Sequence, residues 1–150
     1  MDKFFQWFSG FSDAESNFSI VPKYDKNGDK IVGFNFRFTI GLHLDDKHVL
    51  VFIHNLLGIG NINETDNECK FIVSDKESIK KLISIFNRYH LNTTKYLDYL
   101  DFKEAFILYT TRDGLLKEQL IDKLMLFKNR MNTNRVYFNM PLNHIKITTY

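Results

Sequence analysis

The 150-residue sequence has a single cysteine, Cys69, which rules out a disulfide framework and a cysteine zinc cluster. It also lacks any apolar run approaching the roughly 20 residues that a membrane-spanning helix needs, so we expect no membrane partner. The first residues, Met1-Asp2-Lys3, do not resemble a secretory signal, because charged and polar residues interrupt the apolar region that follows. These absences favour a globular domain.

Alanine is scarce too, since only Ala14 and Ala105 occur, whereas lysine, asparagine, isoleucine and phenylalanine are abundant. This bias is typical of an AT-rich gene such as a mitochondrial intron, and we expect a mitochondrial location. The apolar fraction of 44% is sufficient for a full core. A net charge of +2 and a pI of about 8.6 are compatible with nucleic-acid binding but do not establish it.

Apolar periodicity predicts a helix, two strands, a helix, two strands, a helix and two further helices. The expected ranges are 3–14, 16–24, 30–42, 46–57, 59–64, 68–73, a helix begun by the capping-box pair Ser74 and Glu77, and helices near 97–110 and 114–130. Paired strands between helices predict an α+β fold, with an antiparallel sheet covered by helices on one face. We assign residues 1–131 to this domain and 132–150 to an extended tail or inter-domain connector.

Alternation along the predicted strands leaves one face of the sheet polar. In the predicted strand 30–42, the apolar residues Phe34, Phe36, Phe38 and Ile40 would face one side and Asn35, Arg37, Thr39 and Gly41 the other. The polar set on the uncovered face comprises Asn17, Ser19, Lys23, Asn35, Arg37, Thr39, Asn61, Asn63 and Lys70. Amides, hydroxyls and cations suit base edges and phosphates in a major groove, although an ordinary solvated surface shows the same alternation.

The segment Phe8-Ser9-Gly10-Phe11-Ser12-Asp13-Ala14-Glu15-Ser16 is the most informative part of the chain. Its small residues would let a second helix approach closely. It ends in two carboxylates, and a carboxylate at a helix C-terminus opposes the helix dipole. Such a local conflict is expected at a functional site, and carboxylates beside a basic sheet suit a Mg²⁺ site acting on a phosphodiester.

This segment resembles the signature of the LAGLIDADG family of homing endonucleases and group I intron maturases. Gly10, Asp13, Ala14 and Glu15 fall on its most characteristic positions, whereas Ser16 stands where the family usually has glycine. The likeness continues along the chain, in segments 42–60, 94–102 and 132–150. The chain has one motif, and it looks like the N-terminal half of a two-motif member.

The resemblance implies an αββαββα unit with a saddle-shaped antiparallel sheet and additional C-terminal helices. Glu15 would bind Mg²⁺ or another divalent cation, assisted by the Ala14 carbonyl, and Lys95 would stabilise charge on the phosphate. Glu15 and Lys95 are thus the expected catalytic residues, and Asp13 is expected to form hydrogen bonds rather than bind metal. The association surface expected from the motif comprises Phe8, Ser9, Gly10, Ser12 and Asp13.

One motif supplies one acid and half a saddle, so a partner is needed. The resemblance implies either a homodimer or pairing with a second LAGLIDADG half, acting on a double-stranded DNA target. The function it favours is site-specific DNA cleavage with a divalent metal. An RNA maturase assisting group I intron splicing and a cleavage-inactive ribonucleoprotein component stay open as alternatives, and Ser16 weakly favours these.

Overall fold

A computed structural model describes residues 1–112 and 117–132 of the chain. The elements follow the predicted order. They are α1 (Asp2–Glu15), β1 (Ser16–Tyr24), β2 (Ile31–His43), the 3₁₀ turn η1 (Leu44–Asp46), α2 (Lys47–Leu57), β3 (Asn61–Glu64), β4 (Glu68–Val73), α3 (Lys76–Arg88), α4 (Lys95–Thr110) and α5 (Glu118–Asn129). Apart from Asn132, the predicted connector 132–150 lies outside the described residues.

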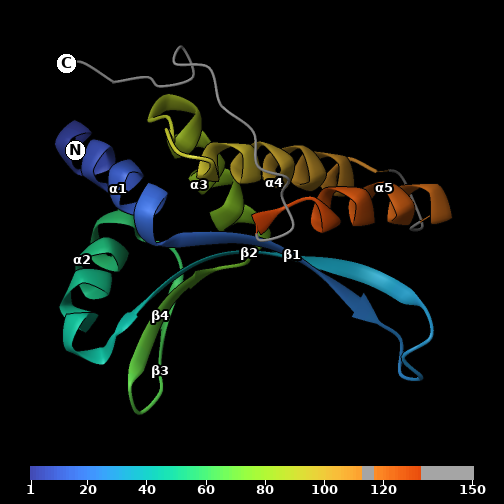
Figure 1. Cartoon of the computed structure of the whole chain (residues 1–150), viewed down its shortest axis with the longest axis horizontal. Coiled ribbons are helices and arrows are strands. Elements are labelled where there is room, and N and C mark those ends of the chain that lie inside the picture. Colours follow the sequence, from blue (N-terminus) through green and yellow to red (C-terminus); the bar gives the residue numbers. More distant parts are fainter. Residues whose placement is uncertain (113–116, 133–150) are drawn as a thin grey trace.

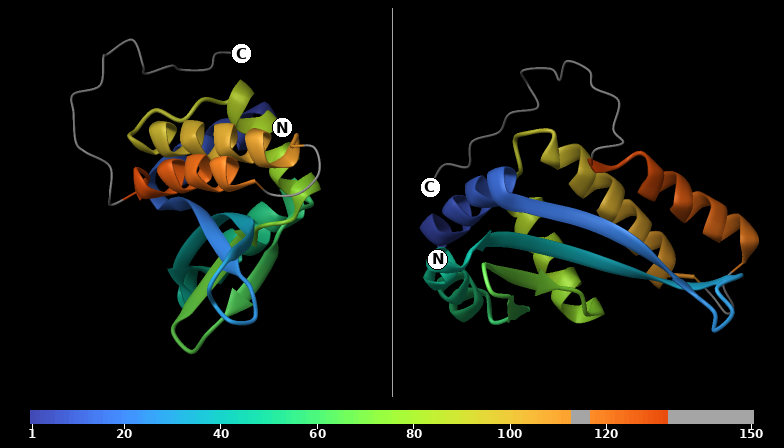
Figure 2. Two further views of the ribbon diagram at one scale, coloured as in Figure 1. Left: turned by 90° about the vertical axis from the view of Figure 1, so that its right-hand side faces the viewer. Right: turned by 60° about the horizontal axis from the view of Figure 1, so that its bottom comes forward.

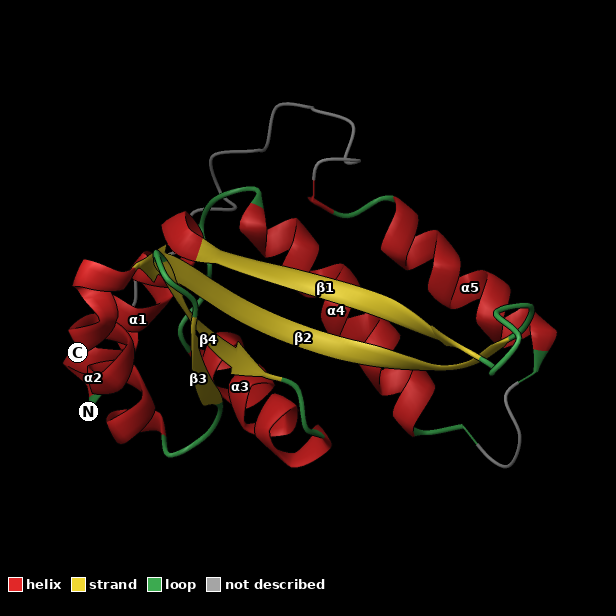
Figure 3. Cartoon of the chain, turned by 90° about the horizontal axis from the view of Figure 1, so that it is seen from below, coloured by secondary structure: helices red, strands yellow, loops and turns green. Residues whose placement is uncertain are grey.

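The four strands form one antiparallel sheet in the order β1-β2-β4-β3. The sheet is arched, and α3, α4 and α5 lie over its convex side (Figure 1). Seen from the opposite side, the strands lie in front of these helices (Figure 3). We call this uncovered face the underside of the sheet. The predicted α+β architecture with helices on one face is therefore confirmed.

Local chemistry explains the turns that set this topology. Gly28 has a φ of +75° in the β1–β2 hairpin, a conformation that glycine adopts without steric cost. Gly58 ends α2 with a φ of +68°, and its N–H donates to the His54 carbonyl. Asp75, rather than the predicted Ser74, caps α3, because its carboxylate accepts a hydrogen bond from the Ser78 N–H. The predicted capping box was therefore wrong by one residue.

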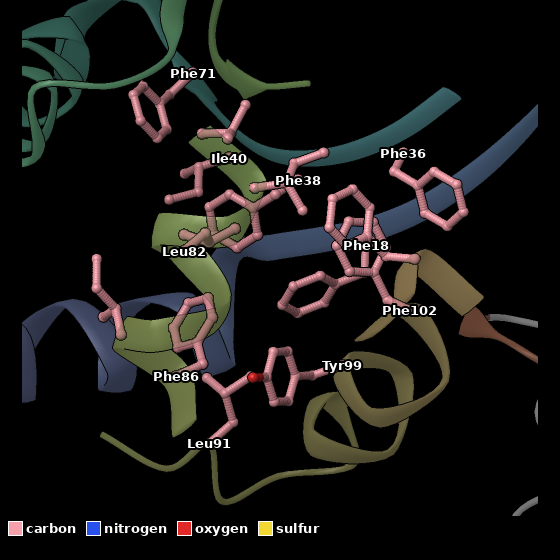
Figure 4. Packing of buried hydrophobic residues seen from close by; sticks show 14 of the residues in the cluster. Phe18, Phe36, Phe38, Ile40, Phe71, Leu82, Phe86, Leu91, Tyr99 and Phe102 are labelled. Atoms are coloured by element: carbon pink, nitrogen blue, oxygen red, sulfur yellow. The ribbon is translucent and has the colours of Figure 1, made fainter. Parts of the chain in front are cut away.

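The core lies between the inner face of the sheet and the helices. Phe18 from β1 and Phe38 from β2 are fully buried, with ring centroids 5.1 Å apart. Phe86 from α3 stacks on Phe8 of α1, with ring centroids 5.5 Å apart. Phe102 from α4 packs on Phe18 (Figure 4). The predicted inward direction of Phe34, Phe36, Phe38 and Ile40 in β2 is confirmed.

Helices α4 and α5 extend the unit beyond the αββαββα core. They lie side by side over the β1–β2 hairpin (Figure 2). The Arg130 guanidinium pairs with Asp101 of α4, with Nη2 2.7 Å from Oδ1. Asn132 then donates through Nδ2 to the Phe18 carbonyl at 2.7 Å, which fixes the chain after α5 against β1. Within the described residues, no helix is long and apolar enough to cross a membrane.

Candidate functional site

The underside of the sheet is a largely polar surface. All nine residues predicted there are exposed or half-buried, and the strand register brings them into cross-strand rows. Asn17 of β1 pairs with Thr39 of β2, and Ser19 pairs with Arg37. Lys70 of β4 pairs with Asn63 of β3. Residues from four strands thus share one face, as the alternation predicts.

Several features of this face were missed by sequence reasoning. Glu68 lies on it opposite His43, so the surface carries an acid as well as cations. Lys23 lies across Gly33, where a Cβ atom would meet both the Lys23 Cε at 2.9 Å and the Tyr109 hydroxyl of α4 at 3.0 Å, so the Lys23 side chain reaches the edge of the sheet beside α4. The half-buried apolar residues Val21 and Ile72 also lie on the underside of the sheet, although the sequence predicted only polar residues on this face.

Glu15 is the last residue of α1, immediately before β1 begins. It is exposed, and no hydrogen bond or ion pair joins its carboxylate to another of the described residues. Ala14 beside it lies in the last turn, where helix carbonyls have no partner within the helix. Both groups offer the hard oxygen ligands that Mg²⁺ prefers. Within residues 1–112 and 117–132, no three His, Cys, Asp or Glu side chains gather into a metal site.

Ser16 has a structural role where the family motif has glycine. Its φ of −94° and ψ of 164° are ordinary extended values, so this position does not require glycine. Its backbone N–H and its hydroxyl both donate to the Ser12 carbonyl, the hydroxyl at 2.6 Å, so the side chain adds a second hydrogen bond at the end of α1. Serine at this position is therefore compatible with the local geometry of the motif.

Asp13 forms a latch between the end of α1 and the segment before α4. Its carboxylate accepts hydrogen bonds from the Asn92 N–H at 3.0 Å, the Thr93 N–H at 3.0 Å and the Thr93 hydroxyl at 2.9 Å. The Thr93 Oγ1 in turn accepts from the Lys95 N–H at 3.2 Å. The carboxylate is fully engaged in these bonds, which is consistent with the expected hydrogen-bonding role.

Lys95 is half-buried and is the first residue of α4. Its backbone is tied through Thr93 to Asp13, two residues before Glu15. In this way the fold brings the two elements that carry the expected catalytic residues together from positions 80 residues apart. Among the described contacts, none joins the Lys95 ammonium directly to Glu15.

The association surface predicted on α1 needs correction. Phe8 is fully buried against Phe38 and Phe86, and Ser9 donates to the Tyr89 carbonyl at 2.7 Å. Ser12 is buried as well, and Asp13 is engaged in the latch. Phe8, Ser9 and Ser12 therefore face their own domain, because tertiary packing uses the small side chains of α1 to bring other segments close to it. Asp13 is half-buried, and its part in association stays a prediction. Gly10 alone is exposed, with open space where a Cβ would stand.

A different set of residues leaves an apolar patch beside Gly10. Trp7 of α1 is 41% exposed and Phe52 of α2 is 49% exposed, with their rings 5.7 Å apart edge to face. Phe11 stacks on Trp7 at 5.0 Å. Val51 and Leu56 of α2 are exposed in addition, and we call this set with Gly10 the α1/α2 patch. Exposed apolar side chains gathered on neighbouring helices are typical of an interaction surface.

Comparison with known proteins places these features in context. A sequence profile described as LAGLIDADG endonuclease matches residues 8–106. The chain is 36% identical over 107 residues to the probable intron-encoded endonuclease Cox1-I1b of Schizosaccharomyces pombe, covering 70% of this chain and 27% of that protein. It is 32% identical over 128 residues to the probable intron-encoded endonuclease 2 of Neurospora crassa, covering 83% of this chain and 26% of that one.

Two solved structures have the same architecture. The LAGLIDADG homing endonuclease I-GzeII, crystallised with its DNA target, superposes with a TM-score of 0.77 and 31% identity, covering 85% of this chain and 44% of its own. The homing endonuclease I-TnaI superposes with a TM-score of 0.77 and 25% identity, covering 87% of this chain and 89% of its own. The present chain thus spans less than a third of both curated relatives.

Proposed function

This chain belongs to the LAGLIDADG endonuclease family, and on that premise we propose that it is one half of an enzyme that cleaves double-stranded DNA at a specific site. The observation that supports this most is the position of Glu15. Its carboxylate, which has no hydrogen bond or ion pair among residues 1–112 and 117–132, stands where α1 meets the polar sheet, so an acid suited to metal binding lies next to a surface suited to DNA. I-GzeII, which shares the fold, was crystallised on its DNA target.

The underside of the sheet is the proposed DNA-binding surface. Four strands about 4.8 Å apart make a row about 14 Å across, comparable to the width of about 12 Å of the major groove. Lys23, Arg37 and Lys70 supply cations for phosphates or guanine edges. The asparagines, Ser19 and Thr39 supply donors and acceptors for the other base edges.

Glu15 and the Ala14 carbonyl are the proposed metal ligands. A carboxylate and a carbonyl are the right donor types, but one carboxylate does not make a complete divalent site. A second acid from the partner half would complete it. When bound, the metal supplies Lewis-acid activation of the phosphodiester and of water. Within this chain, Glu15 holds negative charge at the end of α1, and the latch from Asp13 holds the start of α4.

Lys95 is the proposed phosphate-stabilising residue. Its ammonium would offset negative charge that develops on the phosphate during cleavage, an effect that depends on prior positioning. The Asp13–Thr93–Lys95 bonds provide that positioning at the level of the backbone. The α1/α2 patch, centred on Trp7 and Phe52, is proposed to receive the partner, either a second copy or a second LAGLIDADG half.

The relatives also bear on the origin of the gene and on the alternative function. Two of them are named probable intron-encoded endonucleases, and we propose that this chain too is encoded in a mitochondrial intron. An RNA maturase built on the same scaffold would not need Glu15. Ser16 was the sequence feature that favoured that alternative, and its geometry is compatible with either function.

Incubation with a library of double-stranded sites in Mg²⁺ and in Ca²⁺ tests the proposal. We expect Mg²⁺-dependent cuts on both strands at one sequence. Glu15→Gln should abolish cleavage while leaving DNA affinity within a few-fold, because it removes a metal ligand and no base contact. Glu104→Gln, at an exposed carboxylate of α4, is the matched control and should cleave normally. Normal cleavage by Glu15→Gln would refute the metal assignment, and binding of intron RNA without any DNA cleavage would support the maturase alternative.

A further inference from the structure

Two apolar side chains interrupt the polar underside of the sheet. Val21 of β1 and Ile72 of β4 are half-buried, yet neither belongs to the set of apolar side chains packed on the core. Their neighbours along each strand, Ile20 and Phe71 among them, point inward and are buried. Val21 and Ile72 therefore point to the side on which the polar residues lie.

The register places Ile72 in the middle of a four-strand row. Thr39 pairs with Asn17 on one side and with Ile72 on the other, and Ile72 pairs with Asn61. Along this row the sheet presents the amide of Asn17, the hydroxyl of Thr39, the apolar side chain of Ile72 and the amide of Asn61. Val21 lies in another row, opposite Asn35. Val21 is four residues beyond Asn17 along β1, which is about 13.5 Å at the rise of an antiparallel strand.

Apolar groups at these positions have a specific counterpart in the major groove. Thymine alone among the four bases presents a methyl group there, at C5, and apolar side chains contact it. We propose that Ile72 and Val21 are specificity-determining residues that each recognise a thymine methyl in the target. This inference rests on the proposed binding of DNA by the underside of the sheet.

The spacing makes the proposal quantitative. Since base pairs rise by about 3.4 Å, a separation of about 13.5 Å along the strands corresponds to about four base pairs. The half-site should therefore contain two positions with a preference for thymine, about four base pairs apart. The row that holds Ile72 includes Asn17, which directly follows Ser16 at the end of α1. The thymine read by Ile72 should thus lie nearer the cleavage point than the one read by Val21.

Replacement of thymine by deoxyuridine tests the inference, because it removes the methyl group and nothing else. The preferred duplex is first selected with the wild-type protein, and binding is then measured in Ca²⁺ with each thymine replaced in turn. We expect affinity to fall about fourfold at two positions, as for the loss of one buried methyl contact. At the position nearer the cleavage point, Ile72→Ser should abolish the difference between thymine and uracil, whereas Ile72→Val should keep it.

The outcomes separate the inference from the proposed function. Site-specific binding that is unaffected by every uracil replacement would refute thymine recognition and leave DNA cleavage standing. An equal loss for uracil in the wild type and in Ile72→Ser would refute the assignment to Ile72. Failure to select any DNA site would overturn the proposed function itself. The comparison of thymine with uracil in the wild-type protein needs no mutant, so it tests thymine recognition whether or not Ile72→Ser folds.

Discussion

Neutralising Asp13 and Glu15 separately distinguishes a latch from a metal ligand. In Asp13→Asn, an amide oxygen at the Oδ1 position can still accept from the Asn92 N–H and from the Thr93 N–H and hydroxyl, but the amide NH₂ replaces Oδ2 and cannot accept the second Asn92 hydrogen bond. About one charge-assisted hydrogen bond is lost, which costs about 1.5–3 kcal/mol. Removing a negative charge from a helix C-terminus returns about 0.3–1 kcal/mol. The free energy of unfolding should therefore fall by about 1–2 kcal/mol.

Glu15→Gln should behave in the opposite way. Its carboxylate has no hydrogen bond or ion pair among the described residues, and it too opposes the dipole of α1. The free energy of unfolding should stay the same or rise slightly. Cleavage should be lost because a metal ligand is lost.

Urea unfolding followed by circular dichroism, together with cleavage rates over a range of Mg²⁺ concentrations, measures both effects. Asp13→Asn should lower stability, reduce cleavage only modestly and leave the Mg²⁺ concentration needed for half-maximal rate unchanged. If Asp13→Asn is as stable as the wild type but requires far more Mg²⁺, Asp13 binds the metal and the latch explanation fails.

Four further substitutions test the sheet register, the partner surface and a helix cap. Phe36→Ala should lower the free energy of unfolding by about 3–5 kcal/mol, because it opens a cavity beneath α4. Arg37→Ala, on the opposite face, should leave folding intact and weaken DNA binding by about 1–3 kcal/mol, and equal effects of the two variants on thermal unfolding would show that the register is wrong. Gly10→Leu should fold normally, since open space surrounds that position, but should prevent association in analytical ultracentrifugation; unchanged assembly would exclude this face of α1 from the interface. Hydrogen bonds from the Ser78 side chain and backbone hold the pKa of Asp75 below its ordinary value, so the cap stabilises the fold above about pH 3.9, and this contribution is lost as pH falls through the lowered pKa. Asp75→Ala should accordingly cost about 1 kcal/mol at pH 7 in urea unfolding and progressively less below pH 3.9; a difference independent of pH would exclude the charged cap.

The sequence by itself determined the elements and their faces. Alternation in β2 assigned Phe36 to the core and Arg37 to the underside, because a two-residue period leaves only two sides for a side chain. Gly28 accepts the positive φ of the β1–β2 hairpin, a conformation that few other residues adopt. The motif ending at Glu15 marked the end of α1. Each of these signals is local, because a few neighbouring residues fix the backbone geometry.

Only the tertiary structure decided which segments meet. The Ser9 hydroxyl donates to the Tyr89 carbonyl, so the small side chains of α1 let other segments of the same domain pack closely on this helix. The sequence alone predicted that these side chains would face a partner helix. Asp13 reaches Asn92 and Thr93 across about 80 residues, a pairing that no local spacing encodes. Ile72 joins the row of polar residues because β4 pairs with β2 and β3 in one register, and a shift of one residue would turn it inward. Such long-range pairings follow from the packing of the whole core, which selects one register among many that each strand could adopt alone.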